Sequence, residues 1–285
     1  MKKVLEVSNL NKKYPNFSLS NVNFSIFEDC ITGFIGTNGS GKTTTLRTIL
    51  GLTQKDSGEI KLLGQNIEQH GDQLRNRLGI VFDDGCFYEE LSMHEMKTII
   101  APAYSNWDDS VYHKYMEIFS LNPKQVIATL SKGMKIKFAL TMALSHHADL
   151  LIMDEPTSGL DPLVRSQLID ILNDYMKQGG KAVFYSTHIT SDLEKAADML
   201  IMIHNGQIIF QKDKDALQDE FFVVKGDSRT LTDELAPLFL KIEKMNFGFK
   251  GVTNQLTEVR RKMPDILVER PTIEDIMLAY VEKGK

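Results

Sequence analysis

The sequence predicts an α/β fold with a mostly parallel central sheet. Residues 31–35 form an apolar strand that runs directly into a glycine-rich loop and then into a helix. Residues 150–153 and 182–185 are two unbroken apolar runs of strand length, as is typical of parallel strands buried on both faces. A helical pattern lies between these two runs, which is the order that parallel strands joined by crossover helices require.

The first elements along the chain predict a small antiparallel β region. Residues 4–7 and 22–26 have the pattern of short alternating strands, and a polar turn around residues 12–16 separates them. The strand at 31–35 comes next, and apolar residues at helical spacing follow the glycine-rich loop from Leu46 onward. We therefore expect the chain to begin with antiparallel strands and then to enter the parallel sheet.

Residues 74–145 predict a helical insertion. A strand at 79–82 and an acidic turn come first, and a largely helical stretch follows. We expect a helical subdomain over about residues 86–145. Its apolar positions are Met93, Met96, Ile99, Tyr112, Tyr115, Met116 and Phe119. The first two methionines, with Phe87 and Tyr88, fit a core position and a groove for a partner helix equally well.

A helix and then a hairpin complete the region expected to form the parallel sheet. Apolar residues recur at helical spacing over residues 164–175, and this stripe stops at the glycines 179–180. A hairpin is expected over residues 199–210, because an Asn-Gly pair is a strong signal for a tight turn between strands. We place the end of the main domain here, so that it covers residues 1–210.

The remainder of the chain, residues 211–285, predicts a small α+β appendage. Residues 221–224 have the pattern of a strand and residues 273–281 that of a helix. No chemical motif is recognisable in this segment. We expect it to serve in dimer contact or in regulation.

The composition is that of an ordinary globular protein. Hydrophobic residues make up 42% of the 285 residues and charged residues 25%, so nothing indicates disorder or a fibrous repeat. The net charge of −5 argues against a nucleic-acid surface, which needs a basic field to neutralise phosphates. No apolar run of about 18 residues and no secretory signal is found, so we expect a cytosolic protein. Cys30 and Cys86 are then expected to be reduced thiols.

The glycine-rich loop at residues 36–43 matches the phosphate-loop pattern G-x-x-x-x-G-K-[ST] and has the strand and the helix that this pattern requires. Glycines are needed because backbone N–H groups must surround the phosphates without intervening side chains. We expect Lys42 to reach the β- and γ-phosphates, Thr43 to bind Mg²⁺ and Thr44 to lie near the α-phosphate. The expected nucleotide contacts of this segment are Gly36, Asn38, Gly39, Ser40, Gly41, Lys42, Thr43 and Thr44.

Two acids, Asp154 and Glu155, directly follow the apolar run at 150–153. If this strand is parallel to the one before the phosphate loop, both carboxylates lie at the carboxyl edge of the sheet, where open α/β sheets bind ligands. Asp154 is expected to hold Mg²⁺, and Glu155 to orient a water molecule. The pair therefore predicts hydrolysis of the bound nucleotide. His146 and His147 predict no metal site, because adjacent helical residues face different ways and no third ligand is suitably spaced.

The order of these motifs resembles that of the ATP-binding cassette (ABC) family over roughly the first 210 residues. Residues 130–134, Leu-Ser-Lys-Gly-Met, stand where the family has its signature Leu-Ser-Gly-Gly-Gln, and residues 158–161 stand where it has its D-loop. The resemblance implies that the signature of one subunit closes over the nucleotide of another, with Ser131 stabilising γ-phosphate charge from a helix N-terminus. Gly133 and Asp161 are further nucleotide contacts that it implies.

Three more positions take their roles from the same resemblance. Tyr14 is similar to the aromatic residue that stacks on adenine, His188 to the switch histidine after a strand, and Asp83 occupies the Q-loop position. Glu155 is then the implied general base, and His188 supports the γ-phosphate. For Asp83 a contact with Mg²⁺, direct or through a water, is favoured over a role as a loop cap.

Three departures from the family pattern indicate a subgroup within the family. Lys132 replaces the first signature glycine, Met134 replaces the signature glutamine, and Asp83 replaces the Q-loop glutamine. The Leu-Ser-Lys-Gly-Met form and residues 104–108 resemble bacterial bacitracin- and peptide-exporter ATPases, those of staphylococcal phenol-soluble-modulin exporters among them.

The resemblance implies an ATP-hydrolysing subunit that uses ATP and Mg²⁺ to power export of peptides or of amphipathic antimicrobial or toxin-like cargo. It also implies a separately encoded membrane-spanning permease and a second ATPase subunit, a homodimer being favoured over a heterodimer, at the cytoplasmic face of the membrane. The alternative is a non-transport ABC ATPase that acts on nucleic acid. Three features argue against this alternative: the chain has a single phosphate loop, no sustained heptad pattern and a negative net charge. A purely regulatory nucleotide binder would lack the water-orienting acid, whereas Glu155 is present.

Overall fold

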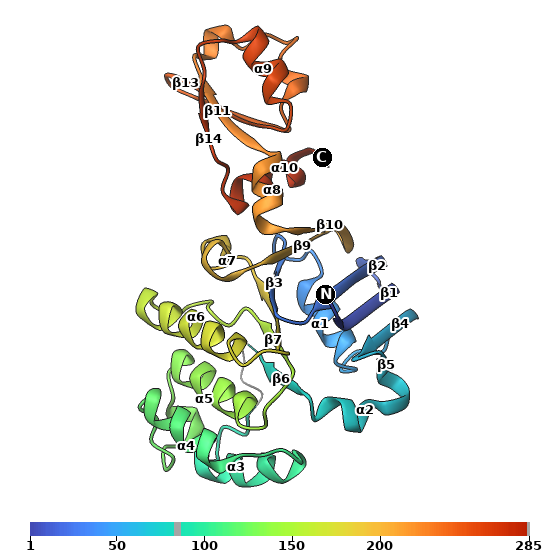
Figure 1. Cartoon of the computed structure of the whole chain (residues 1–285), viewed down its shortest axis with the longest axis vertical. Helices are drawn as coiled ribbons and strands as arrows, with labels where there is room; N and C mark the ends of the chain where they lie inside the picture. The colour runs from blue at the N-terminus through green and yellow to red at the C-terminus, as the bar shows by residue number, and fades with distance from the viewer. Residues whose placement is uncertain (83–86, 284–285) are drawn as a thin grey trace.

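Three β-sheets organise the chain in the computed structural model, which describes residues 1–82 and 87–283 (Figure 1). An antiparallel sheet and a mostly parallel sheet lie together in the larger body. The third sheet lies at the far end of the molecule from helices α3 (Met93–Ile100) and α4 (Asp109–Ile118), so the molecule is elongated.

The central sheet contains, in spatial order, β10 (Gln207–Asp213), β9 (Met199–His204), β3 (Cys30–Ile35), β8 (Ala182–Thr187), β7 (Leu150–Asp154) and β6 (Leu78–Val81). All neighbours are parallel except β10, which is antiparallel to β9. The predicted parallel sheet and the predicted hairpin are therefore confirmed. The hairpin forms the edge of the same sheet and continues to Asp213.

Alternate residues of the central strands face two different layers, which explains why these strands are apolar throughout. On one side the rings of Phe34 and Phe184 lie 5.1 Å apart. They share a buried cluster with Leu46 of α1 (Lys42–Ile49) and with residues of the antiparallel sheet. The helix that follows the glycine-rich loop is thus packed between two sheets, which fixes the position of the loop.

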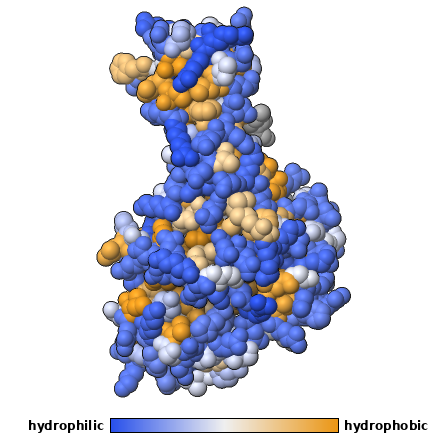
Figure 2. All heavy atoms as spheres, in the orientation of Figure 1, coloured by the Kyte–Doolittle hydropathy of each residue, from blue (hydrophilic) through white to orange (hydrophobic). Residues whose placement is uncertain are grey.

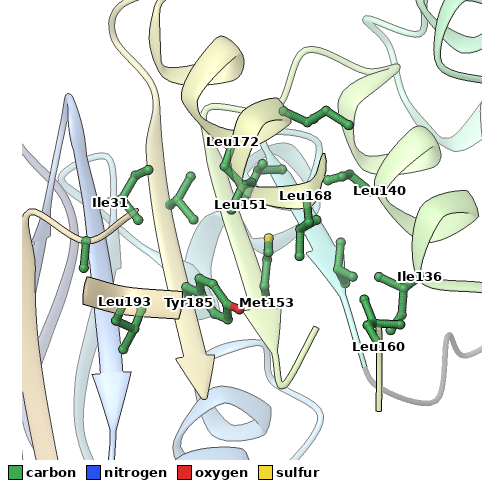
Figure 3. Close-up of a cluster of buried hydrophobic side chains, with 14 of the residues drawn as sticks. Ile31, Ile136, Leu140, Leu151, Met153, Leu160, Leu168, Leu172, Tyr185 and Leu193 are labelled. Carbon is green, nitrogen blue, oxygen red and sulfur yellow. The ribbon is translucent and has the colours of Figure 1, made fainter. Parts of the chain in front are cut away.

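The opposite face of β7 and β8 carries Leu151, Met153 and Tyr185 (Figure 3). Leu168 of α6 (Pro162–Met176) belongs to the same buried cluster and lies over this face. The helix predicted between these two strands is therefore confirmed, and its apolar stripe covers the sheet.

The antiparallel sheet contains, in spatial order, β2 (Phe17–Phe27), β1 (Lys3–Tyr14), β4 (Ser57–Leu62) and β5 (Gln65–Asn66), and α2 (Ile67–Arg75) follows it. Its first two strands are longer than predicted, because only Pro15 and Asn16 separate them. The Lys13 backbone N–H donates to the Asp56 carboxylate (2.6 Å), and Lys12 forms an ion pair with it (3.1 Å). These contacts hold Lys12 and Lys13 in strand form, so the turn that the sequence predicts around residues 12–16 occupies only Pro15 and Asn16.

The helical subdomain contains α3, α4 and α5 (Lys132–Leu144), with two short 3-10 turns at η1 (Ala101–Ala103) and η2 (Ile127–Thr129). Each of the three helices begins at a residue whose side chain accepts a hydrogen bond from the first turn, namely Ser92, Asp108 and Ser131. Met93 and Met96 are buried in the core, which is the first of the two alternatives that the sequence left open. Ile99 lies in α3, as its helical spacing predicts, but its side chain is exposed.

The third sheet is antiparallel and contains β12 (Lys241–Met245), β13 (Gly248–Thr253), β11 (Phe222–Gly226) and β14 (Leu267–Glu269), with α9 (Leu256–Lys262) and the 3-10 turns η3 (Ser228–Thr230) and η4 (Ala236–Leu238) beside it. It has a small core of its own, in which the rings of Phe239 and Phe249 lie 5.7 Å apart. Of these four strands the sequence predicts only β11.

Two helices, α8 (Lys214–Glu220) and α10 (Ile273–Lys283), join the third sheet to the larger body. The ring of Tyr280 in α10 lies 5.4 Å from that of Phe210 and 5.9 Å from that of Phe221. These residues belong to, or pack against, the buried cluster that also covers the central sheet. The junction is therefore a continuous apolar core.

A polar contact reinforces this junction at α7 (Thr190–Ala196). The Glu194 carboxylate accepts a hydrogen bond from the Ile273 backbone N–H (2.5 Å), at the start of α10. It also accepts one from the Gln218 side chain (3.0 Å), which in turn donates to the Pro271 carbonyl (3.0 Å). α7 is thus attached to both joining helices.

The surface is largely hydrophilic, and apolar side chains gather near the end formed by the third sheet (Figure 2). Met245, Phe247 and Leu267 are exposed large apolar residues of that part of the chain. Within residues 1–82 and 87–283, we find no helix with both the length and the apolar character that crossing a bilayer demands.

Candidate active site

A cavity of about 530 Å³ opens over the glycine-rich loop. Its lining comes from four separate segments of the sequence. Three of them follow strands of the parallel sheet, which brings them to one edge, and the fourth lies at the turn between β1 and β2. The lining residues are Asn16, Phe17, Asn38, Gly39, Ser40, Gly41, Lys42, Thr43, Thr44, Glu155, Ser158 and His188. Most of the residues that the sequence predicts around a nucleotide therefore meet at this cavity.

The glycine-rich loop has a shape that larger residues would disturb. Gly41 has φ 113°, and a Cβ at this position would lie 2.7 Å from the Phe17 ring. A Cβ at Gly36 would lie 2.4 Å from the Ile203 carbonyl oxygen. The loop curls around the Lys42 ammonium group, which donates to the Gly36 carbonyl (2.8 Å) and to the Thr37 carbonyl (3.4 Å). Lys42 is thereby held at the floor of the cavity.

Glu155 lies between two of the other predicted site residues. One of its carboxylate oxygens is 3.5 Å from the Lys42 ammonium nitrogen. The other is 2.7 Å from His188 Nδ1 and accepts a hydrogen bond from the His188 backbone N–H (3.2 Å). The phosphate loop, the acid pair and the histidine after β8 are thus connected through a single carboxylate.

The backbone of Glu155 is strained. Its φ of 49° lies in the left-handed region, which non-glycine residues rarely adopt. The Glu155 N–H donates to the Ser186 carbonyl (2.9 Å), and the Ser158 N–H donates to the Glu155 carbonyl (3.1 Å). The turn after β7 therefore has an unusual shape, which directs the Glu155 side chain into the cavity.

Asp154 has the properties of a cation ligand. Burial raises the pKa of its carboxyl group, an effect that the hydroxyls of Thr43 and Ser186 oppose. Its Oδ1 atom is buried and has no hydrogen-bond partner among the described residues. A buried carboxylate oxygen without a partner, beside a hydroxyl, suits Mg²⁺, which proteins hold through one or two carboxylates together with substrate phosphates and water. Asp83, the other predicted acidic ligand, lies outside the described residues.

Tyr14 is the last residue of β1, two residues before Asn16, the first residue that lines the cavity. It is partly exposed, and the Lys12 ammonium lies 5.5 Å from its ring centroid. Among the described residues, those that line the cavity include Asn16 and Phe17 but not Tyr14. Asn16 and Phe17 are not among the residues that the sequence predicts for the site, although their position within three residues of Tyr14 is a signal that could have identified them.

Ser158 of the D-loop lines this cavity, whereas the other D-loop residues and the signature residues lie outside it and close to one another. Ser131 caps α5 by accepting from the Met134 N–H (3.2 Å), and Asp161 caps α6. A Cβ at Gly133 would lie 3.3 Å from the Leu160 side chain, and one at Gly159 would lie 3.6 Å from the Lys132 side chain. The two segments therefore form one surface, which includes the lysine that departs from the family pattern.

His146 has a structural role. Its ring is buried, with Nδ1 3.1 Å from the Met142 carbonyl oxygen and Nε2 3.0 Å from the Leu78 carbonyl oxygen. Burial lowers its pKa. In the described part of the chain no group of three or more His, Cys, Asp or Glu side chains could hold a metal ion. Cys30 is buried, and burial raises the pKa of its thiol; Cys86 lies outside the described residues.

Comparisons with known proteins agree with this arrangement. The family model for ABC transporters matches residues 19–158. The bacitracin transport ATP-binding protein BcrA of Bacillus licheniformis is 32% identical over 212 residues, which cover 73% of this chain and 69% of that protein. The lantibiotic transport ATP-binding protein SrtF of Streptococcus pyogenes is 30% identical over 218 residues, covering 76% of this chain and 93% of that protein.

A solved structure of an ATP binding subunit of an ABC transporter has a similar fold. The TM-score is 0.69 at 29% identity, and the match covers 76% of this chain and 92% of the other. The predicted fold class, with its antiparallel, parallel, helical and C-terminal parts, is confirmed. The chain therefore belongs to the ABC transporter family, as an ATP-binding subunit with ATPase activity coupled to transport.

Proposed function

We propose that this subunit binds ATP with Mg²⁺ in the cavity over the glycine-rich loop and hydrolyses it to power an exporter of peptide-like or amphipathic antimicrobial or toxin-like cargo. The names of two relatives, which refer to bacitracin and to a lantibiotic, support peptide-like cargo. The narrower resemblance to phenol-soluble-modulin exporters stays a prediction.

The observation that carries this proposal is the position of Glu155 between Lys42 and His188 at the edge of the cavity. Lys42 is the fixed cation that meets the β- and γ-phosphates, as in other phosphate loops. The Glu155 carboxylate accepts a proton from the attacking water, and His188 supports the γ-phosphate. Asn38, Gly39, Ser40, Gly41 and Thr44 surround the phosphates with backbone N–H groups and hydroxyls.

Asp154 and Thr43 are the described residues that would hold Mg²⁺, and Asp83 is proposed as a further contact. When bound, the ion neutralises charge on the phosphate oxygens. Tyr14 is proposed to stack on adenine beside Asn16 and Phe17.

We propose that two copies of this chain form a homodimer with two composite sites. Ser131, Gly133 and Asp161 would then face the nucleotide held by the other copy. Their position outside the cavity of their own chain supports such a role. A separately encoded permease completes the transporter, with this subunit at the cytoplasmic face of the membrane. We assign nucleotide binding to residues 1–210 and dimer contact or regulation to residues 211–285.

The test is Glu155→Gln in the full chain, assembled with its permease. The amide keeps the shape of the side chain but cannot accept the proton, so turnover should fall about 10²- to 10⁴-fold while ATP binding is retained. Binding is measured by calorimetry, turnover by phosphate release and dimerisation by light scattering. ATP should trap the dimer. Hydrolysis near the wild-type rate would remove Glu155 from its proposed role.

A further inference from the structure

Tyr185 is a buried residue of β8 that carries a polar group into the core (Figure 3). Its side chain is 0% exposed, yet its hydroxyl donates to Thr157 Oγ1 (2.8 Å) and lies 3.4 Å from Asp192 Oδ2. Both partners are buried as well, Thr157 at 0% and Asp192 at 6% exposed. Burial strongly raises the pKa of Tyr185, so the hydroxyl keeps its proton and remains a donor.

The two partners lie on the two segments that carry Glu155 and His188. Thr157 lies in the turn after β7, between Glu155 and the cavity residue Ser158. Asp192 lies in the first turn of α7, the helix that begins two residues after His188. The Tyr185 hydroxyl therefore connects the turn that bears the catalytic carboxylate with the helix that follows the histidine.

The Glu155 turn and the segment that carries His188 also meet at a second contact, which is exposed where the Tyr185 contact is buried. The direct contact between Glu155 and His188 lies in the cavity, and the His188 side chain is 44% exposed. In the proposed mechanism both side chains turn toward water and phosphate, so this contact changes when ATP binds. The Tyr185 contacts lie below the cavity and involve no group that touches ATP. They can maintain the spacing of the two segments while the direct contact rearranges.

Such a buried link is needed because the turn after β7 is strained at Glu155. A strained turn keeps its shape only where the surroundings determine it, and a misplacement of about 1 Å at a reacting group can cost roughly 100-fold in rate. Removing the Tyr185 hydroxyl would leave two buried polar groups without their common partner.

We propose that Tyr185 is a positioning residue for ATP hydrolysis, which sets the spacing between the Glu155 turn and the His188 helix through Thr157 and Asp192. It acts on the rate of the chemical step and not on the affinity for ATP. This inference rests on the proposed roles of Glu155 and His188.

The experiment compares Tyr185→Phe with Tyr175→Phe in the full chain with its permease. Tyr175 is a matched control, because it is also buried and its hydroxyl donates to a carbonyl oxygen, that of Ala148 (2.8 Å). Both variants lose one buried hydroxyl and should lower Tm similarly. We expect Tyr185→Phe to lower kcat roughly 10- to 100-fold with KM for ATP within about twofold, and Tyr175→Phe to leave kcat within about twofold.

A second pair of variants tests the same link from its other side. Thr157→Ser keeps the hydroxyl and should keep kcat, whereas Thr157→Val removes it at nearly constant shape and should lower kcat as Tyr185→Phe does. Equal kcat for Tyr185→Phe and Tyr175→Phe, or a rate loss in Thr157→Ser as large as in Thr157→Val, overturns the proposal. Glu155→Gln is measured alongside: if it too retains turnover, the proposed function fails, and if it alone loses turnover, only the role of Tyr185 fails.

Discussion

Asp154 places a carboxylate in the protein interior, where charge is costly. Its Oδ1 atom has no hydrogen-bond partner among the described residues, and burial is the largest influence on its pKa, which is raised. Proteins tolerate an unfavourable buried group mainly where function requires it. The nucleotide-free subunit is therefore expected to be less stable than it would be with a neutral residue at this position.

Asp154→Asn should raise Tm in the absence of nucleotide, because the amide is nearly the same size and carries no charge. The same variant should lose the extra rise in Tm that MgATP gives over ATP alone, since it removes the proposed Mg²⁺ ligand. Differential scanning fluorimetry with ATP, with and without Mg²⁺, measures both effects. A variant that is less stable without nucleotide, or that still responds to Mg²⁺, would contradict this account of Asp154.

The stability advantage of Asp154→Asn should also depend on pH. Because the pKa of Asp154 is raised on folding, the folded chain holds this proton at a pH where the unfolded chain has released it. The contribution of the Asp154 carboxyl to the free energy of unfolding is therefore fully present below its pKa in the unfolded chain. It is lost as pH rises through the higher pKa of the folded chain, where the buried carboxyl becomes charged. Urea unfolding should show a larger difference between variant and wild type at about pH 7 than at about pH 4.

For single residues, the sequence predicts those that belong to a motif with fixed spacing. It does not predict those whose role depends on contacts between distant parts of the chain. The loop residues and Glu155 could be predicted because their order along the chain is itself the signal, and they do meet at one cavity. Tyr185 belonged to an apolar run and was predicted only as a strand residue. Nothing local indicates that its hydroxyl meets Thr157 and Asp192, because those contacts exist only in the folded chain.

At the scale of elements, α7 is held near both of its ends. Asp192 contacts the Tyr185 hydroxyl in its first turn, and Glu194 accepts hydrogen bonds from the Ile273 N–H and the Gln218 side chain. The helix that follows His188 is therefore connected both to Tyr185 of the central sheet and to α8 and α10, the two helices that join the third sheet to the larger body.

Glu194→Ala should lower stability by about 1–2 kcal/mol, since it leaves the first amide of α10 and the Gln218 amide without their acceptor. We expect Tm to fall by roughly 2–8 °C and the amides at the start of α10 to lose protection in hydrogen exchange. Glu258→Ala is the control, because it removes an exposed ion pair with Arg261 on α9 and should change stability by less than about 0.5 kcal/mol. Equal behaviour of the two variants would show that Glu194 does not secure α10.

The third sheet shows why some elements were not predicted. β12 has only two apolar residues among three charged ones, in no strict alternation, and is mostly exposed, so its pattern is weak. β13 contains Gly248 and Gly251, which disfavour a strand when only local preference is considered. Gly251 is required because a Cβ there would lie 2.5 Å from the Phe239 ring, and Gly248 because a Cβ would lie 2.6 Å from the Gly226 carbonyl. Both reasons are tertiary and cannot be read from neighbouring residues.

At the scale of the whole molecule, the third sheet lies apart from the cavity and yet shares a core with the body. Val223 of β11 and Val252 of β13 belong to the buried cluster that includes Tyr185 and Leu193, as do Phe210, Phe221 and Ile273 at the junction. Removal of the appendage would therefore leave the cavity residues in place but uncover apolar surface next to α7.

A chain of residues 1–213 should bind ATP with a Kd within about threefold of the full chain, because no cavity residue is removed. It should also aggregate more readily, since Phe210 loses its contact with Tyr280. Calorimetry on the truncated chain, with Phe210→Gln to reduce aggregation, measures the affinity. Full-length Phe210→Gln is the control for that substitution. A truncated chain that unfolds cooperatively but does not bind ATP would show that the appendage is part of the binding unit.

The contact between α10 and α7 also has a consequence during protein synthesis. Ile273 is made roughly 80 residues after the end of α7, a delay of about 4 to 15 s at about 5–20 residues per second. During that time the apolar face that α10 later covers is open on a nascent chain whose phosphate loop and acid pair are already made. Nascent chains that are arrested at this stage should therefore aggregate more readily than chains that have completed α10.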